Sequence, residues 1–390
     1  MRKLKYNILF LFILILCGLN CKEVYNPPAI QNYPHLLVVD GIVLTGNDST
    51  IIMLSRTRSI MDSAPALKEA DAQVSVVGVS GVEYPLLYQG NGRYVTAQLL
   101  LDNTQKYQLK IITKDGNEFR SDLNSIHTSP PIDSIYWDQD SSGVNIYLNT
   151  EDPTNNTRFY RWEYVETWQY YSAFDSQLEY VDVNNIIFRG LPKQVYRCYH
   201  TVASSTIDVA TTTQLSSDIV NKYKITGIAA GSEKLSAIYS ILVKQYAIES
   251  DAFDFWKNLK KNTEQLGTLF DLQPFTELGN IHCVNHPEVK CMGYINFTTL
   301  QEKRIFIDKY QIYFWNYQPY YNSDEPCMVD TATPQNLSAF FLPPGGPYGN
   351  SLIGSGLDPK YHTTIYLFST NLCVDCTDHG GSSVKPDYWP

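Results

Sequence analysis

The sequence predicts a mainly β protein, in which an N-terminal immunoglobulin-like β-sandwich precedes a larger β-rich domain with a helical insertion. Three observations support this fold class. Aromatic residues are abundant, with 29 tyrosines, 16 phenylalanines and 6 tryptophans. Short apolar runs are separated by turn residues, and apolar residues recur at every second position within several of these runs. Because 390 residues exceed one typical domain, we expect at least two folded units.

The N-terminal residues are typical of a cleaved lipoprotein signal. The start is basic, residues 8–16 are apolar, and Cys21 follows. The apolar run is too short to span a bilayer, which takes about 20 apolar residues. We therefore expect removal of residues 1–20 and lipidation of Cys21, with an ordinary secretory cut nearby as the alternative. Residues 21–34 contain three prolines and suit a semi-rigid, lipid-anchored tether.

The two residues after Cys21 resemble the export signal of Bacteroidota surface lipoproteins, in which a lysine and acidic residues follow the lipidated cysteine. Here they are Lys22 and Glu23. The resemblance implies a lipid-anchored protein of the outer membrane that faces the cell exterior. Loss of the basic signal would move the formal net charge from −10 to about −13. Such a surface repels phosphate backbones, which argues against nucleic acid as a partner.

Residues 35–128 should form the immunoglobulin-like sandwich. Within residues 107–113, alternate side chains are apolar, so one face of a strand should lie on a core. Gly90-Asn91-Gly92 and Asp115-Gly116 fit tight hairpins, because these residue types tolerate positive φ. The expected strands are 36–39, 50–54, 73–77, 84–88, 93–99 and 107–113.

Ser129-Pro130-Pro131 marks the boundary to the second domain, residues 129–390, where strand-like alternation resumes. One segment near 250–266 is predicted to be helical. Ser250 can cap the run that follows, whose apolar residues form one stripe, and a glycine comes directly after it. We expect this helix to pack its aromatic stripe against a sheet, while strands continue on both sides of it.

Six cysteines remain beyond the N-terminal region, and an even number in an exported chain indicates disulfides. Cys283 and Cys291 flank a short turn-like segment, so we expect this pair to bond. The remaining four should join the C-terminal tail to the body, with the connectivity between them left open. The disulfide candidates are Cys198, Cys283, Cys291, Cys327, Cys373 and Cys376.

A zinc site is the alternative for the last two cysteines, with His379 and either His282 or His286 as further ligands. The single Cys-x-x-Cys and the oxidising compartment favour disulfides, so we expect neither a metal nor another cofactor. The sequence contains no nucleophile elbow, zinc-protease helix or phosphate-binding loop. We therefore expect no enzymatic activity. An envelope hydrolase is the remaining alternative, because glycosidase carboxylates leave no short motif.

Aromatic clusters are the strongest functional signal in the sequence. Alternating aromatic residues along a strand, as in residues 159–164, should be buried between layers. Loop-like aromatic residues are expected to be exposed, where such rings bind sugars or anchor protein interfaces. The candidates for an interface are Tyr317, Tyr320, Tyr321 and Tyr348.

The chain as a whole resembles Bacteroidota outer-membrane lipoproteins that carry the domain of unknown function 4249. The matching segments are PPIDSIY (130–136), FYRWEY (159–164), YSILVKQY (239–246), FW (255–256), GNI (279–281), CVDC (373–376) and KPDYW (385–389). The resemblance implies a surface lipoprotein associated with TonB-dependent outer-membrane receptors, and it transfers no catalytic residue. We therefore expect a non-enzymatic accessory subunit of an outer-membrane β-barrel or another envelope machine. A glycan- or peptide-binding lipoprotein that feeds a transporter is the alternative.

Two serines also resemble the Asp-Ser/Thr-apolar pattern of O-glycosylation in Bacteroidota envelopes. They are Ser49 and Ser63, and both are expected to lie in loops.

Overall fold

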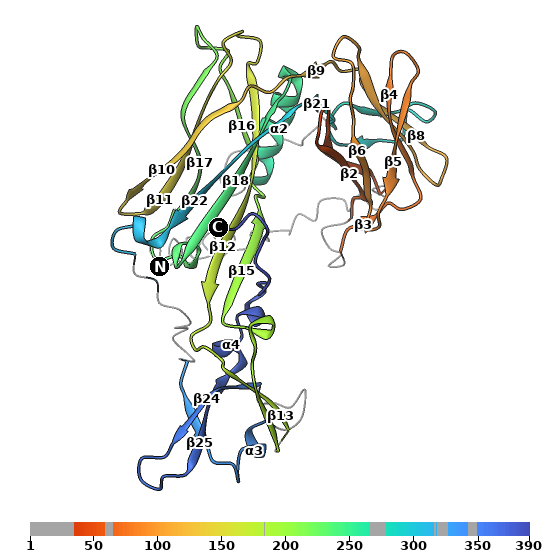
Figure 1. The fold of residues 1–390 in the computed structure, drawn as a ribbon. Helices are drawn as coiled ribbons and strands as arrows, with labels where there is room; N and C mark the ends of the chain where they lie inside the picture. The colour runs from red at the N-terminus through yellow and green to blue at the C-terminus, as the bar shows by residue number, and fades with distance from the viewer. Residues whose placement is uncertain are drawn as a thin grey trace, which may run out of the picture.

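A computed structural model of the chain describes residues 35–58, 65–182, 184–264, 278–315, 317, 327–341 and 349–390. The fold is mainly β, as the sequence predicted, with several separate sheets. Figure 1 shows three bodies: a first body at the upper right, a second body of long strands at the left, and a small third body below. No helix in these described ranges is both long and apolar enough to cross a bilayer.

The first body is one twelve-stranded sheet with the strand order β19-β8-β7-β4-β5-β6-β2-β1-β21-β9, in which β3 lies beside β2 and β20 beside β1. Its strands are β1 (Leu37–Leu44), β2 (Ser49–Arg56), β3 (Leu67–Lys68), β4 (Gln73–Gly78), β5 (Glu83–Tyr88), β6 (Arg93–Gln98), β7 (Tyr107–Ile112), β8 (Glu118–Ser121), β9 (Ile126–His127), β19 (Ile281–Cys283), β20 (Cys291–Met292) and β21 (Phe297–Thr298).

Local sequence explains the hairpins of this body. In β7 every second side chain is buried, as the alternation predicted, because successive residues of a strand face opposite sides of the sheet. The turn between β5 and β6 has positive φ at Gly90, Asn91 and Gly92. A Cβ atom on Gly92 would lie 2.2 Å from the carbonyl oxygen of Leu54, so glycine is required there.

Residues 279–298 return to the first body from far along the sequence, which corrects the expected boundary at 128. The strand β19 pairs antiparallel with β8, and β20 and β21 pair parallel with β1. Ile281, Ile295 and Phe297 are buried in the same core as Leu37 and Phe119. The sequence placed residues 279–298 in the second domain, 129–390, because local patterning does not reveal which sheet a short strand joins.

The second body contains a three-stranded sheet, β10-β11-β17, and a five-stranded sheet, β15-β12-β18-β22, with β16 beside β12. Its core is aromatic: Tyr160, Trp162 and Tyr239 are fully buried, and the Trp162 indole donates a hydrogen bond of 2.8 Å to Gln245 Oε1. The strands are β10 (Ile132–Asp140), β11 (Gly143–Glu151), β12 (Phe159–Tyr171), β15 (Arg197–Ala203), β16 (Asp208–Thr211), β17 (Ile219–Ala229), β18 (Ile238–Ala247) and β22 (Leu300–Asp308).

The helix α2 (Ser250–Glu264) forms where the sequence predicted a helix. Its buried aromatic stripe contacts both large bodies. Phe253 packs on Phe159 of β12 with ring centroids 5.4 Å apart, whereas Phe255 lies 5.5 Å from Tyr294, which precedes β21. The helix therefore lies between the first and second bodies and buries apolar surface of each.

The third body was not separated from the second in the sequence analysis. A hairpin, β13 (Leu178–Asp182) and β14 (Asn185–Phe188), packs beside the sheet β23-β25-β24. The remaining elements here and at the edges of the second body are β23 (Asp330–Ala332), β24 (Asn350–Leu357), β25 (Thr364–Thr370), α3 (Ser338–Phe341), α4 (Asn371–Val374) and the 3-10 helices η1 (Leu191–Lys193), η2 (Glu233–Leu235), η3 (Lys309–Gln311) and η4 (Cys376–His379).

The C-terminal tail packs back on the second body. Trp389 is buried, its indole donates a hydrogen bond of 3.2 Å to Gln169 Oε1, and its ring meets Tyr199 and Phe306 edge-on. The tail is therefore part of the packed fold.

Candidate functional site

Several residues named by the sequence analysis lie outside the described part of the chain. The structure leaves their predicted roles untested. They are Cys21, Lys22, Glu23, Ser63, Tyr320, Tyr321 and Tyr348. Ser49 is described and exposed, but it is the first residue of β2 and not a loop residue as expected.

Four of the six cysteines form disulfides. Cys198 bonds to Cys376 and Cys327 bonds to Cys373, so both ends of the Cys-x-x-Cys hold the tail to distant segments. This arrangement excludes the zinc alternative, because a disulfide sulfur is not available as a thiolate ligand.

The pair expected between Cys283 and Cys291 is not formed. Both residues are free thiols buried in the core of the first body. The thiol of Cys283 contacts Asn285 Oδ1 at 3.3 Å, and that of Cys291 lies toward the carbonyl oxygen of Met292. Burial raises the pKa of the Cys291 thiol to about 12, with the nearby Cys283 adding to this increase, so the group stays protonated and unreactive near neutral pH.

An exposed aromatic loop follows β22. We use this name for residues 309–315. Tyr310 and Tyr313 expose 85% and 76% of their surface, and Phe314 is fully exposed. Three large aromatic side chains thus face solvent within five residues, a density that marks binding surfaces more often than isolated exposed apolar residues do.

Hydrogen bonds and packing fix the shape of the aromatic loop. Gln139, near the end of β10, bonds the backbone of Tyr313 in both directions, donating to its carbonyl oxygen at 2.6 Å and accepting from its amide at 2.9 Å. Ile312 is buried in the core of the second body, and the Trp315 indole donates to the carbonyl oxygen of Ser232 at 2.9 Å. The exposed rings are therefore held on a rigid support.

Phe314 has a φ of 54°, in the left-handed region that bulky side chains rarely adopt. This conformation costs about 1–3 kcal/mol. The exposed ring gains no burial in return, and the backbone conformation is held by the hydrogen bonds of Tyr313 and Trp315 on either side.

Tyr317 differs from the expectation that it is exposed. Its side chain is half-buried, and its hydroxyl donates a hydrogen bond of 3.0 Å to Glu233 Oε1. Burial raises the pKa of this hydroxyl, and the neighbouring Glu233 carboxylate raises it further. Tyr317 therefore helps to close the base of the aromatic loop, while the neighbouring Tyr310, Tyr313 and Phe314 form the exposed surface.

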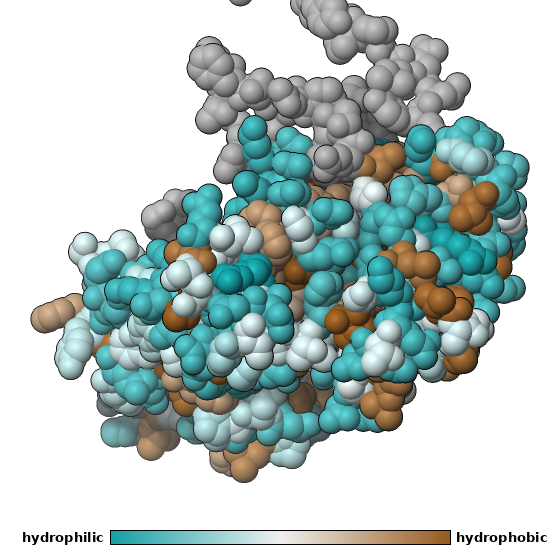
Figure 2. Space-filling view, turned by 90° about the horizontal axis from the view of Figure 1, so that it is seen from above, coloured by the Kyte–Doolittle hydropathy of each residue, from teal (hydrophilic) through white to brown (hydrophobic). Residues whose placement is uncertain are grey.

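Exposed hydrophobic residues also occur outside the aromatic loop, for example Ile187, Phe188 and Leu191. In Figure 2, which views the molecule from above, hydrophobic side chains form small separate patches among hydrophilic ones. This face shows the ordinary mixture of a protein surface. The aromatic loop is the candidate interface because its rings are adjacent in sequence and rigidly supported.

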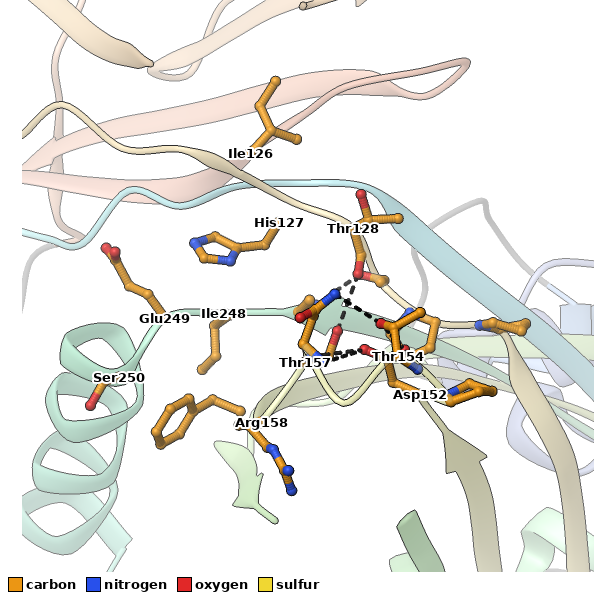
Figure 3. Close-up of a pocket in the computed structure, with 17 residues that line it drawn as sticks. Ile126, His127, Thr128, Asp152, Thr154, Thr157, Arg158, Ile248, Glu249 and Ser250 are labelled. Atoms are coloured by element: carbon orange, nitrogen blue, oxygen red, sulfur yellow. Dashed lines mark hydrogen bonds between the residues drawn. The ribbon is translucent and has the colours of Figure 1, made fainter. Parts of the chain in front are cut away.

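A second candidate site is a hollow of about 740 Å³ at the junction of the two large bodies (Figure 3). We call it the junction hollow. Four segments form its walls: residues 126–131, which lead from the first body to the second; the loop 152–158; Phe159 of β12; and residues 247–250, which lead into α2. Its volume lies in the range of small-molecule sites, and such sites favour domain interfaces.

The loop 152–158 is organised around one carboxylate. Asp152 Oδ1 accepts hydrogen bonds from the amide and hydroxyl of Thr154, and Oδ2 accepts from the amides of Asn156 and Thr157. Burial alone would raise the pKa of Asp152, but these hydrogen bonds outweigh burial and lower it to about 2. Asp152 is therefore a structural carboxylate whose charge is already satisfied.

This carboxylate leads to a prediction about acid stability. We expect Asp152→Ala to lower the free energy of unfolding at pH 7 by about 1–2 kcal/mol, because four donors lose their acceptor. Since the folded pKa is depressed, the contribution is complete above the unfolded value of about 3.9 and is lost as the pH falls toward 2.

Urea denaturation of wild type and variant between pH 7 and pH 2 measures this difference. Asp102→Ala is the control, since Asp102 accepts from Thr104 in a similar but exposed turn and should matter less. A stability difference between wild type and Asp152→Ala that is equal at pH 7 and pH 2 would contradict the assignment.

Among the ionisable residues that line the junction hollow, His127 and Glu249 remain available to a ligand. In Figure 3 the His127 ring extends toward Glu249. Burial lowers the pKa of the His127 imidazole, and the Glu249 carboxylate opposes this shift. Tyr294 donates a hydrogen bond of 2.7 Å to Glu249 Oε1 and fixes this carboxylate. Arg158 points away from both and donates to two backbone carbonyl oxygens.

Of the residues predicted to be exposed near the aromatic loop, Tyr317 is half-buried, whereas Tyr320 and Tyr321 lie outside the described residues; the junction hollow was not predicted. Tyr313 and Phe314 carried a usable signal, because they belong to the same aromatic run as Tyr317. No local signal could have identified the hollow, because its walls come from separate segments that meet only after folding.

Comparison with known protein families identifies the family of the chain. No curated protein matches the chain in sequence. The profile of a domain of unknown function, DUF4249, matches residues 22–304, which is more than half of the sequence, and the chain therefore belongs to the DUF4249 family.

Proposed function

We propose that this chain is a non-enzymatic surface lipoprotein of the Bacteroidota outer membrane, anchored through lipidated Cys21 and facing the cell exterior. In this proposal it is an accessory subunit of an outer-membrane β-barrel, such as a TonB-dependent receptor or another envelope machine. Three features support this location: the basic and apolar N-terminus, the pair Lys22-Glu23 and membership of the DUF4249 family. The two disulfides are consistent with an oxidising compartment. An immunoglobulin-like first body is part of the same proposal.

The proposed docking role rests on the aromatic loop. Rigid aromatic side chains lose little conformational entropy when a partner covers them, and they dominate the energy of many interfaces. Phe314 is fully exposed and strained, so its ring gains no burial that would offset the strain. Strain of this kind gathers at functional positions. A protein partner that covers Tyr310, Tyr313 and Phe314 would explain why the strain is kept.

Native co-purification tests this role. We expect the tagged full-length chain to bring down a barrel in stoichiometric amount from native membranes. The double variant Tyr313→Ser/Phe314→Gly should lose the barrel, while its melting temperature is maintained or raised because glycine relieves the strain at φ 54°.

The matched control is Tyr361→Ser, which removes a ring that is 65% exposed near the tip of the β24–β25 hairpin of the third body. This variant should retain the barrel. Recovery of equal amounts of barrel with the double variant and with wild type would exclude the aromatic loop as the docking surface.

A direct glycan-binding role is the second candidate. A hollow of about 400 Å³ beside Tyr313 and Phe314 is lined by Gln139, Asp140 and Ser141. Aromatic faces beside amide, carboxylate and hydroxyl groups can stack on a sugar and bond its hydroxyls. A glycan array probed with the soluble chain separates the candidates, because saturable binding that the double variant abolishes would favour the glycan.

A further inference from the structure

We infer that the junction hollow is a binding site for a primary ammonium group carried on an apolar body, such as the N-terminus of a short apolar peptide. Nothing in this inference depends on docking to a barrel, because the hollow lies between the first and second bodies and shares no residue with the aromatic loop.

The hollow is preformed. Ser129 fixes the crossing between the bodies: its hydroxyl donates to the carbonyl oxygen of Thr299 at 2.6 Å and accepts from the amide of Ala247 at 2.8 Å. The Thr299 hydroxyl in turn accepts from the amide of Ser129 at 2.9 Å. Three segments that form or border the hollow are thus joined at one side chain, so a ligand would bind without having to order these walls.

The charged groups of the hollow leave one carboxylate oxygen for a ligand. Asp152 is saturated by its own loop, and Arg158 is held by backbone carbonyl oxygens. Glu249 Oε1 accepts from Tyr294, but Oε2 accepts no hydrogen bond from any residue that the structure describes. A carboxylate with one fixed oxygen and one open oxygen is suited to a donor that carries positive charge.

His127 complements this carboxylate. Neither ring nitrogen of His127 forms a hydrogen bond with another residue in the described ranges. Both nitrogens are also accessible, because neither is among the buried polar atoms that lack a partner. Burial lowers the pKa of the ring, which favours its neutral form at pH 7. A neutral imidazole can accept a second N–H bond from an ammonium group, and it adds no positive charge that would repel one.

A further part of the hollow is an apolar surface, which lies beside hydroxyl-bearing residues such as Thr128 and Ser250. The side chains that supply this surface come from both bodies and from the approach to α2: Ile126, Pro130, Pro131, Phe159 and Ile248. Apolar walls with a few convergent polar groups are the usual composition of a small-ligand site. The ligand class that matches both parts has one ammonium group next to aliphatic or aromatic carbon.

Three dipeptides with the same apolar body but different charge test the inference on the purified full-length chain. Leucyl-leucine amide is a cation, N-acetyl-leucyl-leucine amide is neutral, and N-acetyl-leucyl-leucine is an anion. By calorimetry or ligand-observed NMR, we expect the cation to bind about tenfold more tightly than the neutral peptide, and the anion to bind most weakly.

Glu249→Gln should weaken binding of the cationic peptide about tenfold and bring it to the level of the neutral peptide. The matched control is Asp251→Asn, which removes an exposed carboxylate two residues further along the chain that does not line the hollow, and it should retain the preference for the cation. Circular dichroism of both variants checks that the fold is intact.

Three results would each overturn the inference: equal binding of all three peptides, preference of the wild-type chain for the anion, or no binding of leucyl-leucine amide at about 10 mM. Because the three peptides are compared on the wild-type chain, the inference is tested even where a variant misfolds. Loss of barrel co-purification by the Tyr313→Ser/Phe314→Gly variant bears on the aromatic loop alone, so failure of one proposal is distinguishable from failure of the other.

Discussion

Replacing Trp162 with alanine is expected to lower the free energy of unfolding by about 4–6 kcal/mol, a large part of the total stability of most domains. The indole is fully buried, stacks on Tyr160 and Tyr223 with centroids 5.5 and 4.4 Å away, and donates to Gln245. The alanine variant would leave a cavity and would also strip the buried Gln245 Oε1 of its donor.

Urea denaturation followed by circular dichroism measures this loss. Trp137→Ala is the control, because Trp137 packs against the same core but is only partly buried. Trp162→Phe should fall between the two variants, since it keeps most of the volume and loses the hydrogen bond. If Trp137→Ala and Trp162→Ala lower the free energy of unfolding equally, the Trp162 indole does not have the central packing role described above.

Loss of the disulfide between Cys198 and Cys376 should have the second large effect. The bond spans a sequence separation of 178 residues, so in the chain-entropy account Cys198→Ala/Cys376→Ala should cost about 3–5 kcal/mol. The bond also anchors the tail, because Ser382 pairs with Tyr199 next to Cys198. We therefore expect Trp389 to leave its site in this variant and its fluorescence to shift toward that of a solvated indole.

The matched control is Cys327→Ala/Cys373→Ala, which opens a bond with a separation of 46 residues. Differential scanning calorimetry should show an earlier transition of the third body in the control, with the burial of Trp389 unchanged. An unshifted Trp389 signal after loss of Cys198–Cys376 would show that aromatic packing alone holds the tail.

Local features of the fold were predictable from the sequence, and long-range features were not. Residues 107–112 and Ser250–Glu264 have periods of 2 and 3.6 that their own side chains reveal. The pairing of β21 with β1 could not be predicted in this way, because a parallel pairing of only two residues leaves no pattern in either segment. The third body was missed for the same reason: its core collects Leu178, Leu337 and Phe368 from well-separated stretches.

The same difference between local and long-range features applies to the candidate sites. The loop-like aromatic residues beginning at Tyr317 were expected to be exposed, but the sequence could not show that Tyr317 turns inward to Glu233 while Phe314 points out. Cys283 and Cys291 are close enough in sequence to suggest a bond, yet both strands that carry them face a core in which buried thiols are well accommodated. Whether a side chain is exposed, and whether two cysteines bond, depends on neighbours that are distant in the sequence.

The return of β19, β20 and β21 to the first body governs when this protein can fold. Asn124 donates to the carbonyl oxygen of Ile295 at 2.9 Å across a separation of 171 residues. A chain that has emerged only as far as residue 128 has both β1 and β8 without these neighbours, and unpaired strand edges are sites of aggregation. Folding from the N-terminus during synthesis, which is common in multidomain proteins, is therefore incomplete for this body. Its native sheet closes late and through contacts of high sequence separation, which slow folding and prolong the interval in which the unfinished sheet is exposed to aggregation.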